Sequence, residues 1–363
     1  MPNIDLPTIP VVTSPYHQGH APRVEVQCGR PIAAFDLVAR MDSIHNALAG
    51  DHRINMVEPQ IGLAVDEMIR RVHDQELVDF LAQAWEQGHS PCDDLDLLFA
   101  DTFAHRGLHA PHSRRKAAHQ AGALGQYCFD TITGVGPNTF EAAAGSVATA
   151  VTAAGHVARG APLALGLCRP PGHHVSADAF GGGCYLNNAA ISAQWLRDQG
   201  ADKVAIVDID FHHGNGTQAI FYDRADVFYT SLHGHPDRCY PYFTGYAEET
   251  GTGDGRDTTL NLPFGPEIDG AAYGKLIDRA LSAVSSYSPA VVVVSLGFDT
   301  YRGDPAGDAA LDTTDYFSVG QAFSGLGIPT VAVLEGGYSV PDLGSNVRAW
   351  LSGAAGDTAF EGG

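Results

Sequence analysis

Four short apolar runs recur along the chain, and each has the length of a buried strand. They are the segments 161–167 (APLALGL), 203–209 (KVAIVDI), 290–296 (AVVVVSL) and 330–335 (TVAVLE). Each run is too continuous for a strand with one face in water and too short for most helices. Continuous apolar strands are typical of sheets that helices cover on both faces. The pattern therefore predicts a mainly parallel central sheet.

Segments with apolar residues at helical spacing lie between and before these runs. They are 66–88, 138–160, 187–200, 269–287 and 313–327. Strands that alternate with helices imply right-handed crossovers. The sequence thus predicts an α/β fold, with a single three-layer α/β/α domain over residues 1–363. The segment 89–126 shows no clear periodicity, and we expect it to be an inserted surface loop.

Composition narrows the range of partners. With 42 acidic residues against 21 basic ones, the formal net charge is -21. A molecule with this negative charge repels nucleic acid and attracts cations. The charge can serve solubility alone, or it can serve to attract a cationic substrate. The six cysteines form no CxxC pair, which argues against disulfides and a thiolate zinc site. We see no secretory signal and no apolar run of the ~20 residues that span a membrane, and expect a cytoplasmic protein.

Polar and ionisable residues follow each of the four predicted strands. In chain order these residues are His173, His174, Asp208, Asp210, His212, Asp299, Asp304 and Tyr338. In open parallel sheets, ligands bind beyond the carboxyl ends of the strands. Convergence of these side chains at one edge indicates an active site more strongly than any single motif does.

The stretch VDIDFHHGNG (207–216) indicates a metal site. In an extended segment Asp208, Asp210 and His212 share one side. Catalytic zinc usually takes three protein ligands and a water, and Asp299, at the end of another strand, is the natural third ligand beside Asp210 and His212. A lone Asp-x-His is more often a local hydrogen-bonded pair. The histidines and Asp299 at neighbouring strand ends favour the metal.

His173 and His174 follow RPPG, whose prolines and glycine predict a tight turn. Histidine suits both a general base and a general acid near neutral pH. Asp208 is too close to Asp210 for both to be ordinary metal ligands, so we expect it to orient an imidazole. Tyr338 follows LEGG and can donate a hydrogen bond to a developing oxyanion. In isolation, exposed histidines and a surface tyrosine would be the simpler interpretation.

Five segments together resemble the histone deacetylase superfamily, which has an arginase-like fold, and within it the bacterial acetylpolyamine amidohydrolases. They are RPPGHHVSADAFGGGCYLNNAAISA (169–193), VDIDFHHGNGTQAIFY (207–222), SLHGHPDRCYPYFTGYAEETGTG (231–253), SLGFDTYRGDP (295–305) and LEGGYSVPDLGSNV (334–347). The resemblance runs from about residue 20 over nearly the whole chain.

The resemblance implies two cations. Zinc, or ferrous iron, would be held by Asp210, His212 and Asp299. A structural potassium ion would be held nearby, partly through backbone carbonyls, by Asp208, Asp210, His212, Ser231 and Leu232. Two cations would explain why so many charged residues end a buried strand.

The resemblance also implies catalytic roles. His174 would serve as general base and then general acid, and His173, held by Asp208, would be its electrostatic partner. Tyr338 would polarise the amide carbonyl. Asn215 would be the neighbour of His174, and a neutral neighbour should leave His174 less basic than an aspartate would.

The substrate tunnel departs from the family pattern. These deacetylases commonly line the tunnel with two aromatic residues, of which one resembles Tyr240 or its neighbour Tyr242. The other position is Gly183, so we expect a wider tunnel on that side. In the polyamine enzymes an inserted loop narrows the site and forms a dimer, and the segment 89–126 is in the right place for a homodimer contact. Its acidic residues Asp93, Asp94, Asp96 and Asp101 could attract a distal ammonium.

The resulting prediction is a zinc-dependent amidohydrolase that deacetylates acylated amines, above all acetylpolyamines. Within the same chemistry, the alternatives are a protein acetyl-lysine deacetylase and a hydrolase of a bulkier small amide suited to Gly183. An inactive acyl-amine-binding protein is the alternative of another class, although every catalytic position is filled. An arginase-type ureohydrolase needs two metals and more carboxylate ligands than the sequence offers.

Overall fold

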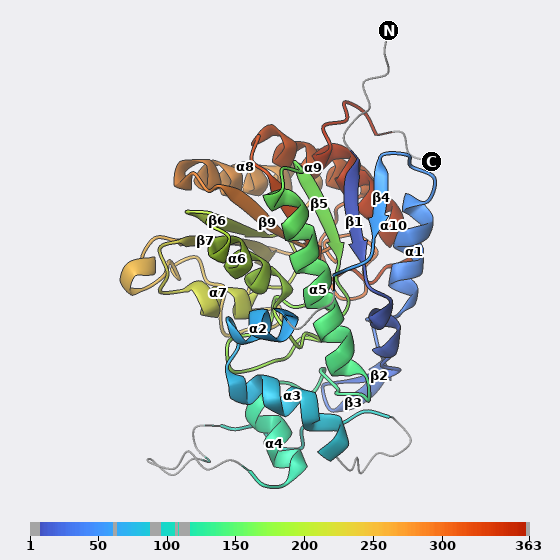
Figure 1. Ribbon diagram of the computed structural model, residues 1–363, viewed down its shortest axis with the longest axis vertical. Coiled ribbons are helices and arrows are strands. Elements are labelled where there is room, and N and C mark those ends of the chain that lie inside the picture. The colour runs from blue at the N-terminus through green and yellow to red at the C-terminus, as the bar shows by residue number, and fades with distance from the viewer. Residues whose placement is uncertain (1–7, 61–63, 88–95, 106–107, 109–116, 361–363) are drawn as a thin grey trace.

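The four apolar runs form central strands of one eight-stranded sheet in the computed structural model, which describes residues 8–60, 64–87, 96–105, 108 and 117–360 (Figure 1). The strand order is β4-β1-β5-β10-β9-β6-β7-β8, and every neighbouring pair is parallel. The strands are β1 (Ile9–Thr13), β4 (Ile54–Val57), β5 (Leu163–Leu167), β6 (Val204–Asp208), β7 (Val227–Gly234), β8 (Thr259–Phe264), β9 (Val291–Leu296) and β10 (Thr330–Leu334). The prediction of a mainly parallel sheet is confirmed.

Helices cover both faces of this sheet and complete the three layers. One face packs against α1, α8, α9 and α10, and the other packs against α5, α6 and α7. The helices are α1 (Ala39–Leu48), α2 (Ala64–Arg70), α3 (Gln75–Gln87), α4 (Gln120–Tyr127), α5 (Thr139–Ala158), α6 (Asn188–Asp198), α7 (Asn215–Phe221), α8 (Gly270–Tyr287), α9 (Thr313–Gly325) and α10 (Val340–Ala354). Two short 3-10 helices are η1 (Pro15–Gly19) and η4 (Gly253–Gly255).

Alternate side chains of the central strands enter two different cores. On β9, Val292 and Val294 pack with the α8–α10 side, whereas Val291 and Val293 pack with the α5–α7 side. Burying a valine stabilises the fold by about 1.5–3 kcal/mol relative to leaving it exposed. Both faces of β9 are buried, and no polar residue interrupts its valine run. A shift of the strand by one residue would therefore bury no additional apolar side chain.

The carboxyl ends of the strands face one end of the molecule. Figure 1 shows α3, α4 and a small antiparallel hairpin together at this end, away from both termini. The hairpin consists of β2 (Val24–Gln27) and β3 (Arg30–Ala33). The chain descends through β1 to the hairpin, and all strands of the sheet are parallel, so the residues that follow them converge here.

Some predicted boundaries differ from the structure. The helix expected over 66–88 is two helices, α2 and α3, because the turn between them is held by a hydrogen bond from Asp74 N to Ala177 O. The segment 89–126, expected to be a surface loop, contains the start of α4. In its described part, Leu98 bridges to Val135, and Leu97, Leu98 and Leu124 are buried. This part therefore packs onto the domain through apolar contacts.

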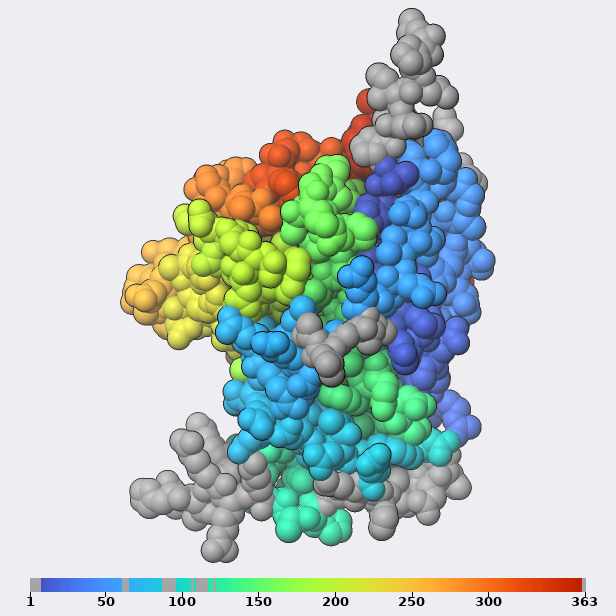
Figure 2. Space-filling model, viewed as in Figure 1, coloured from blue at the N-terminus to red at the C-terminus, as the bar shows by residue number. Residues whose placement is uncertain are grey.

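The helices of one face form a continuous surface. In the space-filling view, α2 lies between α3 and α6, and the strands behind these helices are largely hidden (Figure 2). Among the described helices, none is both long and apolar enough to cross a membrane.

The crossing of α9 and α10 leaves no space for a side chain at its two glycines. An alanine Cβ at Gly320 would lie 2.1 Å from Trp350 O, and one at Gly353 would lie 2.1 Å from Phe317 O. The two helices can approach this closely only because both positions lack a Cβ.

We expect Gly320→Ala to destabilise the protein by about 1–3 kcal/mol, because the helices must separate to admit the methyl group. Gly325→Ala, in the same helix with open space around its Cβ, should leave the stability unchanged or slightly higher. Thermal unfolding of the two variants checks this. Equal melting temperatures would contradict the tight crossing.

Candidate active site

Asp210, His212 and Asp299 lie together beyond the ends of β6 and β9, and one ligand atom of each is within 4.8 Å of the others. His212 Nδ1 is 3.3 Å from Asp210 Oδ1 and 2.9 Å from Asp299 Oδ2. Backbone donors orient both buried carboxylates: Gly336 N donates to Asp210 Oδ2 at 2.8 Å and Phe211 N to Asp299 Oδ1 at 2.7 Å. The structure thus brings the three predicted metal ligands together.

This donor set fits a divalent cation. Burial and the charge of Asp210 raise the pKa of Asp299 above its usual value. An imidazole nitrogen between two carboxylate oxygens carries either a proton or a cation, and His212 Nδ1 occupies such a position. Imidazole nitrogen and carboxylate oxygen are ligands of both zinc and ferrous iron. A cation at this point would also offset the repulsion between the two carboxylates.

His173 is held by Asp208 at the end of β6, as the sequence predicts. His173 Nδ1 is 3.0 Å from Asp208 Oδ2, and Tyr229 Oη donates to the same oxygen at 3.3 Å. Burial alone would lower the pKa of His173, but Asp208 and Asp210 raise it to about 10. The main chain of His173 is also fixed, because Glu335 Oε2 accepts its N–H at 3.2 Å. Its imidazole is therefore oriented from both sides.

The contacts of His174 define its tautomer. Its Nδ1 is 2.7 Å from Asn215 Oδ1, and Asn215 Nδ2 donates to His174 O at 3.2 Å. Since the amide oxygen faces the ring, Nδ1 carries the hydrogen and Nε2 keeps its lone pair. Burial lowers the pKa of His174 well below its usual value, and His173 and His212 lower it further. His174 is therefore neutral near pH 7, which is the state that a general base requires.

Tyr338 is fixed by contacts on its ring and its backbone. Arg40 lies 4.8 Å from the ring centroid, and the Phe35 ring packs against it at 5.9 Å. Asp304 Oδ2 accepts the backbone N–H groups of Tyr338 and Ser339 at 2.5 and 2.9 Å. Burial raises the pKa of Tyr338 well above its usual value, so the phenol stays protonated and can donate a hydrogen bond.

The residues expected to hold potassium lie beside the metal cluster. Asp208 pairs with Ser231 in the register of β6 and β7, and Leu232 follows Ser231. All three residues are fully buried. Ser231 Oγ is 2.8 Å from His233 Nδ1. Potassium binding at this position stays a prediction of the family resemblance.

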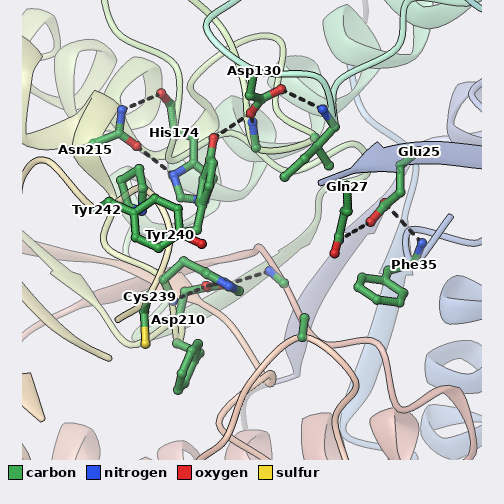
Figure 3. Close-up of a pocket in the computed structure, with 18 of the residues that line it drawn as sticks. Glu25, Gln27, Phe35, Asp130, His174, Asp210, Asn215, Cys239, Tyr240 and Tyr242 are labelled. Atoms are coloured by element: carbon green, nitrogen blue, oxygen red, sulfur yellow. Dashed lines mark hydrogen bonds and ion pairs between the residues drawn. The ribbon is translucent and has the colours of Figure 1, made fainter. Parts of the chain in front are cut away.

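A cavity of about 1010 Å³ opens over the two histidines, Asp210 and Tyr338. His174, Asp210, Asn215 and Tyr240 line it in the close-up view (Figure 3). The Tyr240 ring stands nearly perpendicular to the His174 ring, with centroids 5.0 Å apart. Tyr242 is 50% exposed, so Tyr240 is the aromatic residue that covers His174.

The cavity wall is open at Gly183. This residue lines the cavity, has a φ of 70°, and has no atom within 4 Å of the position that a Cβ would take. Its N–H donates to Thr133 Oγ1 at 2.8 Å, which fixes the backbone without filling the space. A bulkier group of a substrate can therefore enter on this side.

Asp130 is a residue whose role the sequence did not reveal. Its Oδ2 accepts hydrogen bonds from Tyr240 Oη and Gly182 N, both at 2.6 Å. Its Oδ1 accepts the N–H groups of Ile132 and Thr133 at 3.1 Å. Asp130 thus ties the Tyr240 wall to the Gly182 turn. The only local signal in the sequence is that aspartates often accept the backbone N–H of the residue two positions later in a turn, as Asp130 does here.

Arg40 and Glu335 were also missed. Arg40 Nε donates to Gly337 O and its Nη2 to Glu335 O, each at 2.6 Å, so α1 fixes the turn before Tyr338. Glu335 Oε2 accepts Gly172 N at 2.7 Å and joins this turn to the loop that carries the two histidines. These contacts join residues far apart in the chain, and no local pattern marks them.

The acidic residues proposed for the inserted segment are only partly described. Asp93 and Asp94 lie outside the described residues. Asp96 and Asp101 are exposed and do not line the cavity, and Asp96 lies 3.8 Å from Arg23. The described part of the segment therefore offers no acidic group to the site.

Comparison with known proteins gives consistent matches. Residues 37–354 match the profile of the histone deacetylase domain. An acetylpolyamine amidohydrolase of Mycoplana ramosa is 40% identical over 347 residues, which cover 95% of this chain and 99% of that protein. Acetylpolyamine amidohydrolase 1 of Pseudomonas aeruginosa is 39% identical over 350 residues, which cover 95% and 98%. A crystal structure of an acetylpolyamine aminohydrolase from Burkholderia pseudomallei superimposes with a TM-score of 0.88 at 36% identity, over 96% of this chain and 99% of that one.

A divalent cation should stabilise the folded protein, because the Asp210–His212–Asp299 cluster exists only after folding. Adding Zn²⁺ to chelator-treated protein at about 100 times its Kd should contribute about 2.7 kcal/mol, seen as a higher melting temperature. Asp299→Asn should lose most of this shift. Asp254→Asn removes the same charge from an exposed turn and should keep it. No shift in the wild type would contradict the metal site.

Proposed function

The chain belongs to the histone deacetylase family, and on that basis we propose that it hydrolyses the acetyl amide of acetylated polyamines. One juxtaposition supports the proposal most directly. Asp210 and His212 of the Asp210–His212–Asp299 cluster, together with His174 and Tyr338, line a single cavity of about 1010 Å³, and Asp299 is buried directly behind them. The relatives whose names specify acetylpolyamines resemble this chain over nearly its full length.

The cluster would hold zinc, or ferrous iron, through Asp210, His212 and Asp299. A cation there supplies a Lewis acid for the amide carbonyl and for the attacking water. His174 accepts the proton of that water at Nε2, because its Nδ1–H is held by Asn215. The same proton then passes from Nε2 to the nitrogen of the leaving amine, which departs as a neutral group.

Two further groups stabilise the charge that develops during the reaction. Tyr338 donates its phenolic hydrogen to the carbonyl oxygen as that oxygen becomes an oxyanion. His173 lies 4.1 Å from His174 between ring centroids, and Asp208 fixes its orientation. Arg40 and Asp304 contact Tyr338 and its backbone, so they position the phenol and do not touch the substrate.

A second candidate, a hydrolase of a bulkier amide, is favoured by the open wall at Gly183. An aromatic side chain at this position would narrow the cavity, and none is present. Tyr240 still covers the His174 ring. The same catalytic groups would serve either substrate, so only the acyl group or the amine would differ.

Free amine released from acetylputrescine, acetylcadaverine and an acetyl-lysine peptide, compared side by side with metal-loaded protein, tests the proposal. We expect the highest kcat/KM with the two acetylated diamines. Activity restricted to the peptide would overturn the polyamine assignment in favour of protein deacetylation. Hydrolysis of a larger acyl amide, without hydrolysis of any of these three substrates, would support the second candidate.

Tyr338→Phe should lower kcat by roughly 10²–10³, the usual effect of losing one oxyanion donor. KM should change little, because the phenol acts mainly in the transition state. Tyr287→Phe, which loses a hydrogen bond to Ala225 O far from the cavity, should keep full activity. Steady-state kinetics of both variants measures this, and an unchanged kcat in Tyr338→Phe would refute the assigned role.

A further inference from the structure

Glu25 differs from the other acidic groups of the catalytic cavity. Five acidic side chains line this cavity among the described residues. Asp36 is held by two arginines, and Asp308 pairs with a surface arginine. Asp130 accepts four hydrogen bonds, and Asp210 belongs to the metal cluster. For Glu25, the described part of the chain contains no ion-pair partner.

The carboxylate of Glu25 is nevertheless built into the wall. Glu25 belongs to β2 and is only 7% exposed. Its Oε1 accepts a hydrogen bond from Gln27 Nε2 at 2.6 Å, and its Oε2 accepts a weaker one from Phe35 N at 3.4 Å. A carboxylate has about four acceptor sites, so two of them remain for a ligand. Burial of an unpaired carboxylate is costly, and a bound cation would offset this cost.

The position of Glu25 suits the far end of an extended substrate. Figure 3 shows Glu25 and Gln27 across the cavity from His174, Asn215 and Tyr240. Phe35 connects the two sides: its backbone N–H contacts Glu25 and its ring packs on Tyr338. An alkyl chain that leaves the scissile amide at Tyr338 can therefore cross the Phe35 ring and reach Glu25.

We propose that Glu25 binds a second, cationic amino group of the substrate, and so selects amides that carry a distal ammonium. The assignment rests on the proposed function, because it places the acetyl group at His174 and Tyr338. An ammonium would donate to the free acceptor sites of Glu25 and form the missing ion pair. The net charge of -21 would draw such cations towards the molecule.

The test compares acetylputrescine with N-pentylacetamide, in which a methyl group replaces the ammonium. Wild-type enzyme should prefer the cationic substrate, and Glu25→Gln should lower kcat/KM for it by roughly 10–100-fold while leaving the neutral amide unchanged. Glutamine has the same shape and keeps one acceptor oxygen for the short hydrogen bond from Gln27 Nε2, losing only the weaker bond from Phe35 N, so the variant should fold. Glu25→Asp retains the charge on a shorter side chain, so its preference should shift towards the longer acetylcadaverine.

Asp308→Asn is the matched control, because it removes one negative charge from the same cavity at a residue that is already paired. It should keep the wild-type preference for the cationic substrate. An unchanged preference in Glu25→Gln would overturn the proposal and leave the deacetylase function intact. If neither amide is hydrolysed, the proposed deacetylase function is refuted, separately from the role of Glu25. Calorimetric binding of acetylputrescine then decides the role of Glu25: weaker binding to Glu25→Gln supports it, and equal binding refutes it.

Discussion

Three carboxylates, those of Asp208, Asp210 and Asp299, are fully enclosed at the ends of β6 and β9, and each must be balanced. Unpaired charges in the interior are costly, so the surrounding residues are those that provide positive charge or hydrogen-bond donors. His173, His212 and the backbone N–H groups around them meet part of this requirement. A divalent cation would meet the rest, and its binding would then be coupled to folding at this site.

The parallel sheet makes this arrangement possible. Its register places Asp208 level with Ser231 on one side and Ser295 on the other. The next residues of each strand therefore emerge at the same height and meet above the sheet. A shift of one residue would turn the ligands of β6 away from the site. The register of the parallel strands thus also sets the spacing of the groups in the candidate site.

The sequence predicted the parts of the structure that have a local signal. Continuous apolar runs located β5, β6, β9 and β10, and the residues at their ends indicated the metal and histidine groups. The strands β1, β4, β7 and β8 were not recognised. β1 contains Pro10, and β4 is short and half exposed, so neither has the continuous apolar pattern.

The missed site residues act through contacts over long distances along the chain. Arg40 reaches Gly337 across 297 positions, and Asp130 reaches Tyr240 across 110. Nothing in the few residues around Arg40 distinguishes it from an ordinary surface charge, and the local signal of Asp130 is one that many aspartates in turns share. Only the folded arrangement reveals that one fixes the turn before Tyr338 and the other fixes the aromatic wall. By contrast, Asn215 lies in the HHGNG stretch and could be identified from the sequence.

The hairpin of β2 and β3 stands apart from this core, and its independence has an evolutionary consequence. The match to the family profile begins at residue 37, after the hairpin. In the described part of the chain its two strands pair with each other and with no strand of the large sheet, so substitutions there need not change the register of that sheet. Yet Glu25 and Gln27 on β2 form part of the cavity wall. A lineage could therefore acquire a new amine preference through substitutions in this hairpin, while the residues that hydrolyse the amide remain under separate selection.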